Sequence, residues 1–218
     1  MPKIAIIDYD MGNLHSARKG IEKAGATTII TDAVEELERA DAIVLPGVGA
    51  FDPAMQHLRQ HNLIEPIRRI IDSGKPFLGI CLGLQVLFEA SEEGSEKGLG
   101  IFSGKVRRFQ VEPDITVPHM GWNSLDLTQP DLPIWQSLPS NPYLYFVHSY
   151  YVEPADPSLA AAMIMHGSQQ VTAAIARDNV VAVQFHPEKS SKNGLQILAN
   201  FVGGLAKSPL QDKASIVS

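Results

Sequence analysis

The first 90 residues alternate between short apolar runs and segments with apolar residues at helical spacing. The apolar runs predict strands over residues 4–7, 27–31, 41–45 and 77–80. The segments between and after them predict helices, most clearly over residues 63–71 and 82–90. Because these strands are continuous apolar runs, we expect a parallel sheet covered by helices on both faces.

The pattern changes between residues 98 and 187, where short β-rich segments are punctuated by proline and glycine. We expect strands over residues 105–110, 124–127, 144–152, 160–165, 171–176 and 180–185, and a closing helix over 195–205. The predicted fold class is therefore α/β: a three-layer, open, mostly parallel sheet with helices on both faces, plus an antiparallel β-rich extension. No composition shift marks a domain boundary, so residues 1–206 should form a single domain and residues 207–218 a polar tail.

Composition and charge exclude several classes of partner. Among 218 residues there are 18 basic and 24 acidic side chains, and the net charge of −6 shows no electrostatic signature of nucleic-acid or membrane-surface binding. The longest apolar stretch, residues 76–88, is too short to span a bilayer, and the N-terminus lacks a signal-peptide pattern. A single cysteine excludes an internal disulfide framework. We expect a cytoplasmic protein with no nucleic-acid or membrane partner.

Two histidines four residues apart, His57 and His61, raise the question of a metal site. The glutamate that metalloproteases carry between such histidines is missing, and the sequence offers no obvious third ligand. We therefore expect a solvated helix face here, and neither a metal nor an organic cofactor in the protein.

The strongest chemical signal is Cys81, which stands between a predicted strand and a predicted helix in the string Gly79-Ile80-Cys81-Leu82-Gly83. This is the arrangement of a nucleophile elbow, in which flanking glycines let strand and helix approach while the central residue takes a strained turn. The helix N-terminus favours a thiolate, and the next backbone N–H, on Leu82, can stabilise an oxyanion. The alternative is a buried structural cysteine, the usual environment of a free cysteine.

A base and its orienting group are available at His186 and Glu188, which follow another predicted strand. The proline between them ends the strand and stiffens the turn, so both side chains can face one site. His119 and His148 are competing bases, but neither has a carboxylate within several residues. The glycine turn over residues 46–51 can aim a backbone N–H at the same site, although glycine also suits a plain loop.

Together these motifs resemble those of the class I glutamine amidotransferases, which use a Cys-His-Glu triad. The resemblance extends from Asp8 to about Ser191. Within this family, four segments are similar to the glutaminases that serve a cyclase in histidine biosynthesis: residues 46–51, 118–123, 148–150 and 189–190.

The resemblance implies that L-glutamine is the substrate and that Cys81, His186 and Glu188 are the catalytic residues. It implies an oxyanion hole formed by backbone of Val48, Gly49 and Leu82. It also implies contacts to the amino-acid part of glutamine from Gly49, Gln85, Glu93, Ser149 and Tyr150. A solvated surface charge is the alternative interpretation of Glu93.

The resemblance further implies a heterodimer with a (β/α)₈-barrel cyclase that receives ammonia through a dry channel and makes imidazole glycerol phosphate and aminoimidazole carboxamide ribotide. We expect the surface facing it to include Asn13, Met120, Trp122 and Lys189, although Trp122 could equally be a core residue. Three alternatives stay open: a glutaminase serving anthranilate, guanylate or carbamoyl phosphate synthesis, a non-catalytic member of the fold, and a cysteine hydrolase that acts without a partner.

Overall fold

A computed structural model of the chain describes residues 1–113 and 115–205. Its central feature is a parallel sheet in the order β2-β1-β3-β4-β13. The bounds of these strands are Lys3–Ile7 (β1), Thr27–Thr31 (β2), Ala42–Gly47 (β3), Phe77–Cys81 (β4) and Val180–Val183 (β13). The apolar runs at the start of the sequence are therefore strands of this sheet, as predicted.

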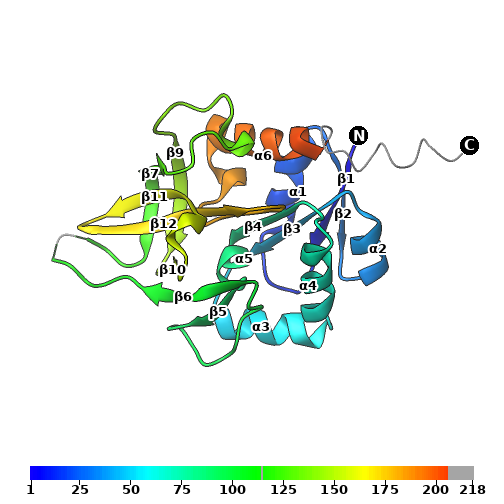
Figure 1. Cartoon of the computed structure of the whole chain (residues 1–218), viewed down its shortest axis with the longest axis horizontal. Helices are drawn as coiled ribbons and strands as arrows, with labels where there is room; N and C mark the ends of the chain where they lie inside the picture. Colours follow the sequence, from blue (N-terminus) through cyan, green and yellow to red (C-terminus); the bar gives the residue numbers. More distant parts are fainter. Residues whose placement is uncertain (114, 206–218) are drawn as a thin grey trace, which may run out of the picture.

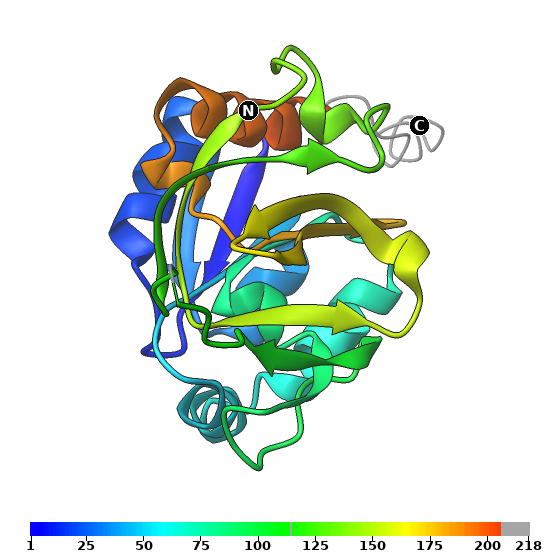
Figure 2. The same ribbon diagram turned by 90° about the vertical axis from the view of Figure 1, so that its left-hand side faces the viewer.

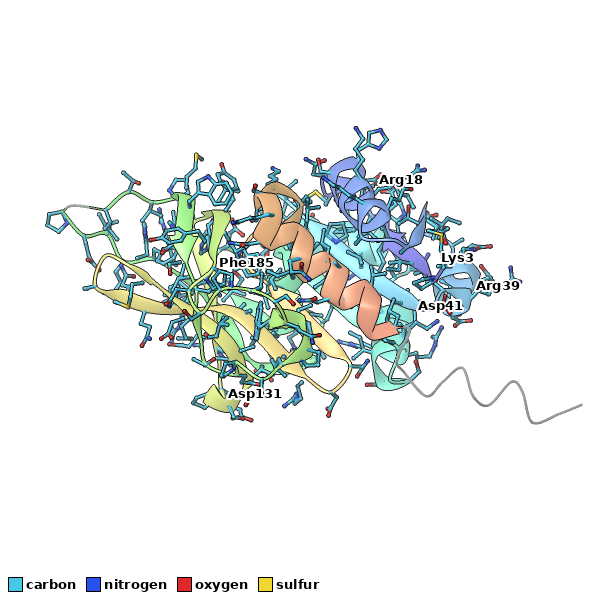
Figure 3. All side chains as sticks on the ribbon, turned by 90° about the horizontal axis from the view of Figure 1, so that it is seen from above. Lys3, Arg18, Arg39, Asp41, Asp131 and Phe185 are labelled. Atoms are coloured by element: carbon cyan, nitrogen blue, oxygen red, sulfur yellow. The ribbon has the colours of Figure 1, made fainter. Side chains whose placement is uncertain are left out.

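Helices cover both faces of the parallel sheet (Figure 1). One face carries α1 (Leu14–Lys23) and α6 (Ser191–Leu205), which lie side by side in Figure 3. The other carries α2 (Val34–Arg39), α3 (Phe51–Gln60) and α4 (Ile64–Asp72). Within β1, alternate residues belong to the two apolar clusters, which is the consequence of a strand buried on both sides.

The antiparallel extension begins at β12, which runs antiparallel to β13 and continues the sheet through β10, β6 and β5 (Figures 1 and 2). A separate two-stranded ribbon, β7–β9, packs against it. The bounds are Phe88–Ser91 (β5), Phe102–Arg108 (β6), His119–Ser124 (β7), Asp126–Leu127 (β8), Tyr143–His148 (β9), Tyr150–Pro154 (β10), Ala160–His166 (β11) and Gln169–Arg177 (β12). Short 3₁₀ turns are η1 (Pro133–Trp135), η2 (Pro157–Leu159) and η3 (Pro187–Lys189). The predicted fold class is confirmed.

Three predicted elements differ from the structure; one is the strand expected over 124–127, which is divided at Leu125 between the end of β7 and β8. The helix expected over residues 82–90 is wrong beyond its first turn, because α5 spans only Leu82–Gln85 and β5 follows. Residues 86–88 are a short, fully buried apolar run, and periodicity cannot assign such a run to helix or strand. The strand expected over 144–152 is divided at Ser149, where the chain leaves the β7–β9 ribbon and enters the main sheet.

Two further predictions concern the extent of the domain and the absence of a membrane-spanning segment. The polar tail predicted over residues 207–218 lies outside the described residues, so the single domain over 1–206 stays a prediction. Among residues 1–113 and 115–205, no helix is long and apolar enough to cross a membrane.

Helix α6 makes a close contact with η3 through Gly194. A Cβ atom on Gly194 would overlap the carbonyl of Pro187 and lie 2.7 Å from Cβ of Ser190. The hydroxyl of Ser190 donates in turn to the carbonyl of His186 at 2.6 Å. The absence of a side chain at Gly194 thus allows the helix to support the turn that carries His186.

Replacing Gly194 by alanine should destabilise the fold by about 1–3 kcal/mol, because the methyl group overpacks this contact. The matched control is Gly203→Ala in the same helix, where no atom of residues 1–113 and 115–205 lies within 4 Å of the added Cβ. That substitution should stabilise by about 0.5–1 kcal/mol through helix propensity. Urea unfolding measures both effects, and equal effects at the two positions would contradict the close contact at Gly194.

Candidate active site

Loops after three neighbouring strands meet at the carboxyl edge of the parallel sheet. Val48 and Gly49 follow β3, Cys81 ends β4, and His186 follows β13. Strand β4 pairs in parallel with both β3 and β13, so the ends of the three strands lie side by side. Open α/β sheets bind their ligands at this edge.

A cavity of about 260 Å³ opens between these loops. The predicted site residues that line it are Val48, Gly49, Cys81, Leu82, Gln85, Glu93, Ser149, Tyr150 and His186. Pro118, Val147 and His148 complete the lining. The fold therefore gathers into one concave site residues that are more than a hundred positions apart in the sequence.

Cys81 occupies a strained backbone conformation, with φ 55° and ψ −110°. Such angles are sparsely populated by residues other than glycine. The flanking glycines allow them: a Cβ on Gly79 would lie 2.9 Å from the carbonyl oxygen of Gly83, and a Cβ on Gly83 would overlap the carbonyl of Leu45. The elbow geometry expected from the sequence is present. The helix that follows, α5, has only four residues, so only a single helical turn contributes a dipole that favours a thiolate.

His186 and Glu188 form a buried pair beside the cavity. Nδ1 of His186 lies 2.8 Å from Oε1 of Glu188, and their side chains are 2% and 3% exposed. The carboxylate accepts a hydrogen bond from Nδ1–H of His186. Nε2 has no hydrogen-bond partner among the described residues, so it is available for chemistry in the cavity. Burial disfavours the charged ring, but Cys81 and Glu188 outweigh it and raise the pKa of His186 to about 9. The site therefore favours an imidazolium next to the sulfur.

Glu93 belongs to the cavity rather than to a solvated charge cluster. It follows β5, and its Oε2 accepts the backbone N–H of Phe51 at 2.8 Å. Phe51 is the first residue of α3, where the helix dipole favours a negative charge. This contact orients the carboxylate that lines the cavity.

Gln184, which the sequence analysis did not single out, contacts the sulfur directly. This side chain is completely buried, and its Nε2 donates to Sγ of Cys81 at 3.6 Å. Its Oε1 accepts from Nε2 of Gln85 at 3.0 Å, and the same Nε2 donates to the carbonyl of Tyr150 at 3.1 Å. The signal in the sequence was an amide that interrupts the apolar run over residues 180–185.

The two competing histidines are neutral members of a hydrogen-bond relay. Nδ1 of His148 donates to the carbonyl of Tyr150 at 2.8 Å, so Nε2 of His148 accepts from Nδ1 of His119 at 3.1 Å. Nε2 of His119 then accepts from the amide of Asn123 at 3.3 Å. Burial lowers the pKa of His148 to about 3 and that of His119 to about 4. Such weak bases favour His186 as the residue that exchanges protons near neutral pH.

The residues predicted to face a partner lie outside the cavity lining. Met120 and Trp122 are 62% and 52% exposed on β7, so the core interpretation of Trp122 is wrong. Lys189 is exposed in η3. Asn13 has a structural contact of its own, because its side chain accepts the N–H of Ser16 at 3.2 Å and caps α1.

His57 and His61 are partly exposed, but a candidate third ligand that the sequence did not reveal lies beside them. Asp10, from the loop after β1, lies within 3.3 Å of His57 and 2.9 Å of His61. The sequence could not show this third group, because 51 residues separate Asp10 from His61.

Comparisons with known proteins agree with this geometry. The family model described as "Glutamine amidotransferase class-I" matches residues 5–204, and the chain belongs to this family, as the motifs predicted. Curated relatives include two proteins named "Imidazole glycerol phosphate synthase subunit HisH". The one from Gloeothece citriformis is 70% identical over 202 residues, covering 93% of this chain and 96% of the relative. The one from Synechococcus elongatus is 63% identical over 213 residues, covering 98% of each.

Solved structures of distant relatives share the fold. The structure of PurLQS from Thermotoga maritima has a TM-score of 0.73 at 18% identity, covering 94% of this chain and 99% of that chain. The glutaminase domain of Trypanosoma brucei CTPS with bound acivicin has a TM-score of 0.66 at 19% identity, covering 95% of each. At these identities the likeness concerns the fold alone.

Replacing Gln184 by methionine should slow the alkylation of Cys81 by iodoacetamide about tenfold at neutral pH, because the sulfur loses a donor that stabilises its negative charge. Cys81 is the only cysteine of the chain, so incorporation measured by mass spectrometry reports on this sulfur alone. Gln136→Met, at an exposed position, is the matched control and should react like the parent protein. Unchanged alkylation of the Gln184 variant would show that this hydrogen bond does not activate the sulfur.

Proposed function

We propose that this chain is the glutaminase subunit of an imidazole glycerol phosphate synthase. It would hydrolyse L-glutamine to glutamate and pass the ammonia to a cyclase subunit. The observation that carries the proposal is Cys81, held at a strained elbow in a cavity that it shares with the buried His186–Glu188 pair. The names of the relatives at 63–70% identity support the choice of synthase.

In the first half of the proposed reaction, Sγ of Cys81 attacks the side-chain carboxamide of glutamine. A sulfur–carbon bond forms, and the carbonyl oxygen takes up the negative charge. The N–H of Leu82 and the backbone of Val48 and Gly49 are the proposed donors to this oxyanion. Gly49 has a φ of 107°, a conformation that favours glycine and lets the turn present its amide toward the cavity.

Proton transfer is assigned to His186. As an imidazolium it protonates the departing amine, so that the carbon–nitrogen bond breaks and a glutamyl thioester with Cys81 remains. The neutral ring then takes a proton from water, the water oxygen attacks the thioester carbonyl, and the sulfur–carbon bond breaks to release glutamate and the thiolate of Cys81. Glu188 holds the ring tautomer and stabilises its positive charge in both halves of the reaction.

The amino-acid part of glutamine would bind at the other end of the cavity. Gln85 uses its amide hydrogens on Tyr150 and Gln184, so its carbonyl oxygen is the group it can offer to an α-ammonium. The carboxylate of Glu93 has the charge to bind the same group. Ser149 and Tyr150 are the proposed contacts to the remaining polar atoms of the substrate.

The proposed partner is a (β/α)₈-barrel cyclase, bound as a heterodimer. Ammonia released into neutral water is mostly protonated and no longer a nucleophile, so a glutaminase of this kind needs a dry path to its acceptor. Met120 and Trp122 offer an exposed apolar contact on β7, with Asn13 and Lys189 as polar contacts. We expect the complex to act in the cytoplasm, where the thiol of Cys81 stays reduced, and to need no cofactor for glutamine hydrolysis.

Cys81→Ala should abolish glutamine-dependent formation of imidazole glycerol phosphate by the reconstituted complex, because the nucleophile is lost. Ammonium salts should still support the reaction, because the cyclase chemistry is separate. The control is the parent complex, assayed with each nitrogen source. An unchanged glutamine-dependent rate would exclude Cys81 as the nucleophile. An active glutaminase whose ammonia reaches only another acceptor enzyme would instead support one of the other synthases.

Trp122→Ala should weaken the subunit complex about 30-fold, as expected for a central aromatic contact of about 2 kcal/mol. Arg39→Ala is the control, because Arg39 is exposed on α2, which packs on the parallel sheet and not on the β7–β9 ribbon. Isothermal titration of the cyclase into each variant gives the affinities. Parent-like affinity of the Trp122 variant would show that the interface lies elsewhere.

A further inference from the structure

Three side chains outside the cavity lining bring their metal-binding atoms together. Oδ2 of Asp10 lies 2.9 Å from Nε2 of His61 and 3.3 Å from Nδ1 of His57. All three atoms lie within 4.8 Å of one another. Around a tetrahedral zinc ion, neighbouring ligand atoms are about 3.3 Å apart. The distances from Oδ2 of Asp10 to the two histidine nitrogens are therefore close to those between the ligand atoms of a tetrahedral zinc ion.

The two histidines present their rings on one side of α3. They are four residues apart, and His61 is the residue that caps the end of the helix. This spacing places both side chains on the same helix face, as in helical metal sites that use a histidine pair. Asp10 approaches that face from the loop between β1 and α1. Two separate segments thus contribute to the cluster.

A second carboxylate prepares His61 for coordination. Nδ1 of His61 lies 3.0 Å from Oδ2 of Asp32, which follows β2. A carboxylate that accepts from Nδ1–H directs the lone pair of Nε2 outward, and metal-bound histidines commonly have such a partner. With Nδ1–H directed to Asp32, a metal ion bound at Nε2 would also reach the carboxylate of Asp10, whose Oδ2 lies 2.9 Å from that nitrogen.

We propose that Asp10, His57 and His61 form a binding site for a divalent transition-metal ion, with Zn²⁺ as the ion that suits the ligands best. Two imidazole nitrogens and one carboxylate oxygen are common zinc ligands, and water would complete the tetrahedron. Magnesium and calcium prefer sites made of oxygen atoms, so this site discriminates against them. The two nearby carboxylates, Asp10 and Asp32, balance the charge of the ion.

A bound ion would link the loop after β1, through Asp10, to the C-terminal end of α3, through His57 and His61. That loop packs on the glycine turn after β3: a Cβ on Gly49 would lie 2.9 Å from Cε of Met11, and a Cβ on Gly12 would lie 3.4 Å from the carbonyl oxygen of Pro46. Helix α3 begins directly after the same turn. Zinc at Asp10 would therefore connect the two segments that border the turn.

Zinc titration of the full chain tests the site. The parent protein in this titration carries Cys81→Ala, because the thiol together with His186 can also bind zinc. A chelator first removes any bound metal from the parent and from each variant. Calorimetry should show one Zn²⁺ per chain and no saturable binding of Mg²⁺. Asp10→Asn and His57→Gln should each weaken zinc binding at least tenfold, because each removes one ligand. His15→Ala, at an exposed position on α1, is the matched control and should bind like the parent.

Thermal unfolding supplies a second measurement. At a zinc concentration one hundred times the dissociation constant of the parent, the midpoint temperature of unfolding should rise by about 5–10 °C in the parent and in the His15 variant. Little or no rise should occur in the Asp10 and His57 variants, whose unfolding without metal shows that they are folded. Zinc binding with parent affinity in either variant, or the absence of saturable binding in the parent, would overturn the proposal.

Discussion

The backbone of Cys81 is the constraint on which the rest of the site depends. A non-glycine residue at this positive φ costs about 1–3 kcal/mol, which the surrounding packing must offset. Two features supply that packing: the parallel register that places Gly47 opposite Cys81 and Leu45 opposite Gly79, and the direct contact of Gly83 with the Leu45 carbonyl. The same register fixes the turn after β3 next to the sulfur. Cys81 and the turn at Val48 and Gly49, the proposed nucleophile and oxyanion donors, are therefore positioned by a single set of strand contacts.

The groups hydrogen-bonded in series to the sulfur of Cys81 are neutral, and the charged groups beside it are confined to the His186–Glu188 pair. Gln184, Gln85, the Tyr150 carbonyl, His148 and His119 form a continuous hydrogen-bonded series from Sγ to the β7–β9 ribbon. Each member is neutral, because burial keeps the two histidines unprotonated. A satisfied buried network is rigid, and a neutral one does not compete with the ionised groups of the site. Burial lowers the pKa of His186, but the contacts with Cys81 and Glu188 outweigh it and raise that pKa.

The sequence predicted the parallel half of the fold well, because its strands are local apolar or β-branched runs and several of its turns carry glycine, as at Gly25, Gly49 and Gly74. It failed where pairing with a distant segment decides the outcome. Phe88 belongs to a strand because it pairs with Phe102, and Ser149 interrupts a strand because the chain changes sheets there. Cys81 and His186 were recognisable from their neighbours in sequence. Gln184 and Asp10 were not assigned a role, because no motif surrounds them and their contacts are to residues 103 and 51 positions away.

The antiparallel extension gives this site something that a parallel sheet alone lacks. Parallel strands deliver their loops to one edge, where the cavity and the Asp10–His57–His61 cluster both lie. The extension adds β9, which ends at His148 inside the ribbon, and β10, which starts at Tyr150 in the main sheet. The residues at this crossing line the cavity, while Met120 and Trp122 remain exposed on the neighbouring strand. A displacement of the ribbon would therefore act on His148, Ser149 and Tyr150 directly, because the ribbon and the cavity wall are one continuous backbone.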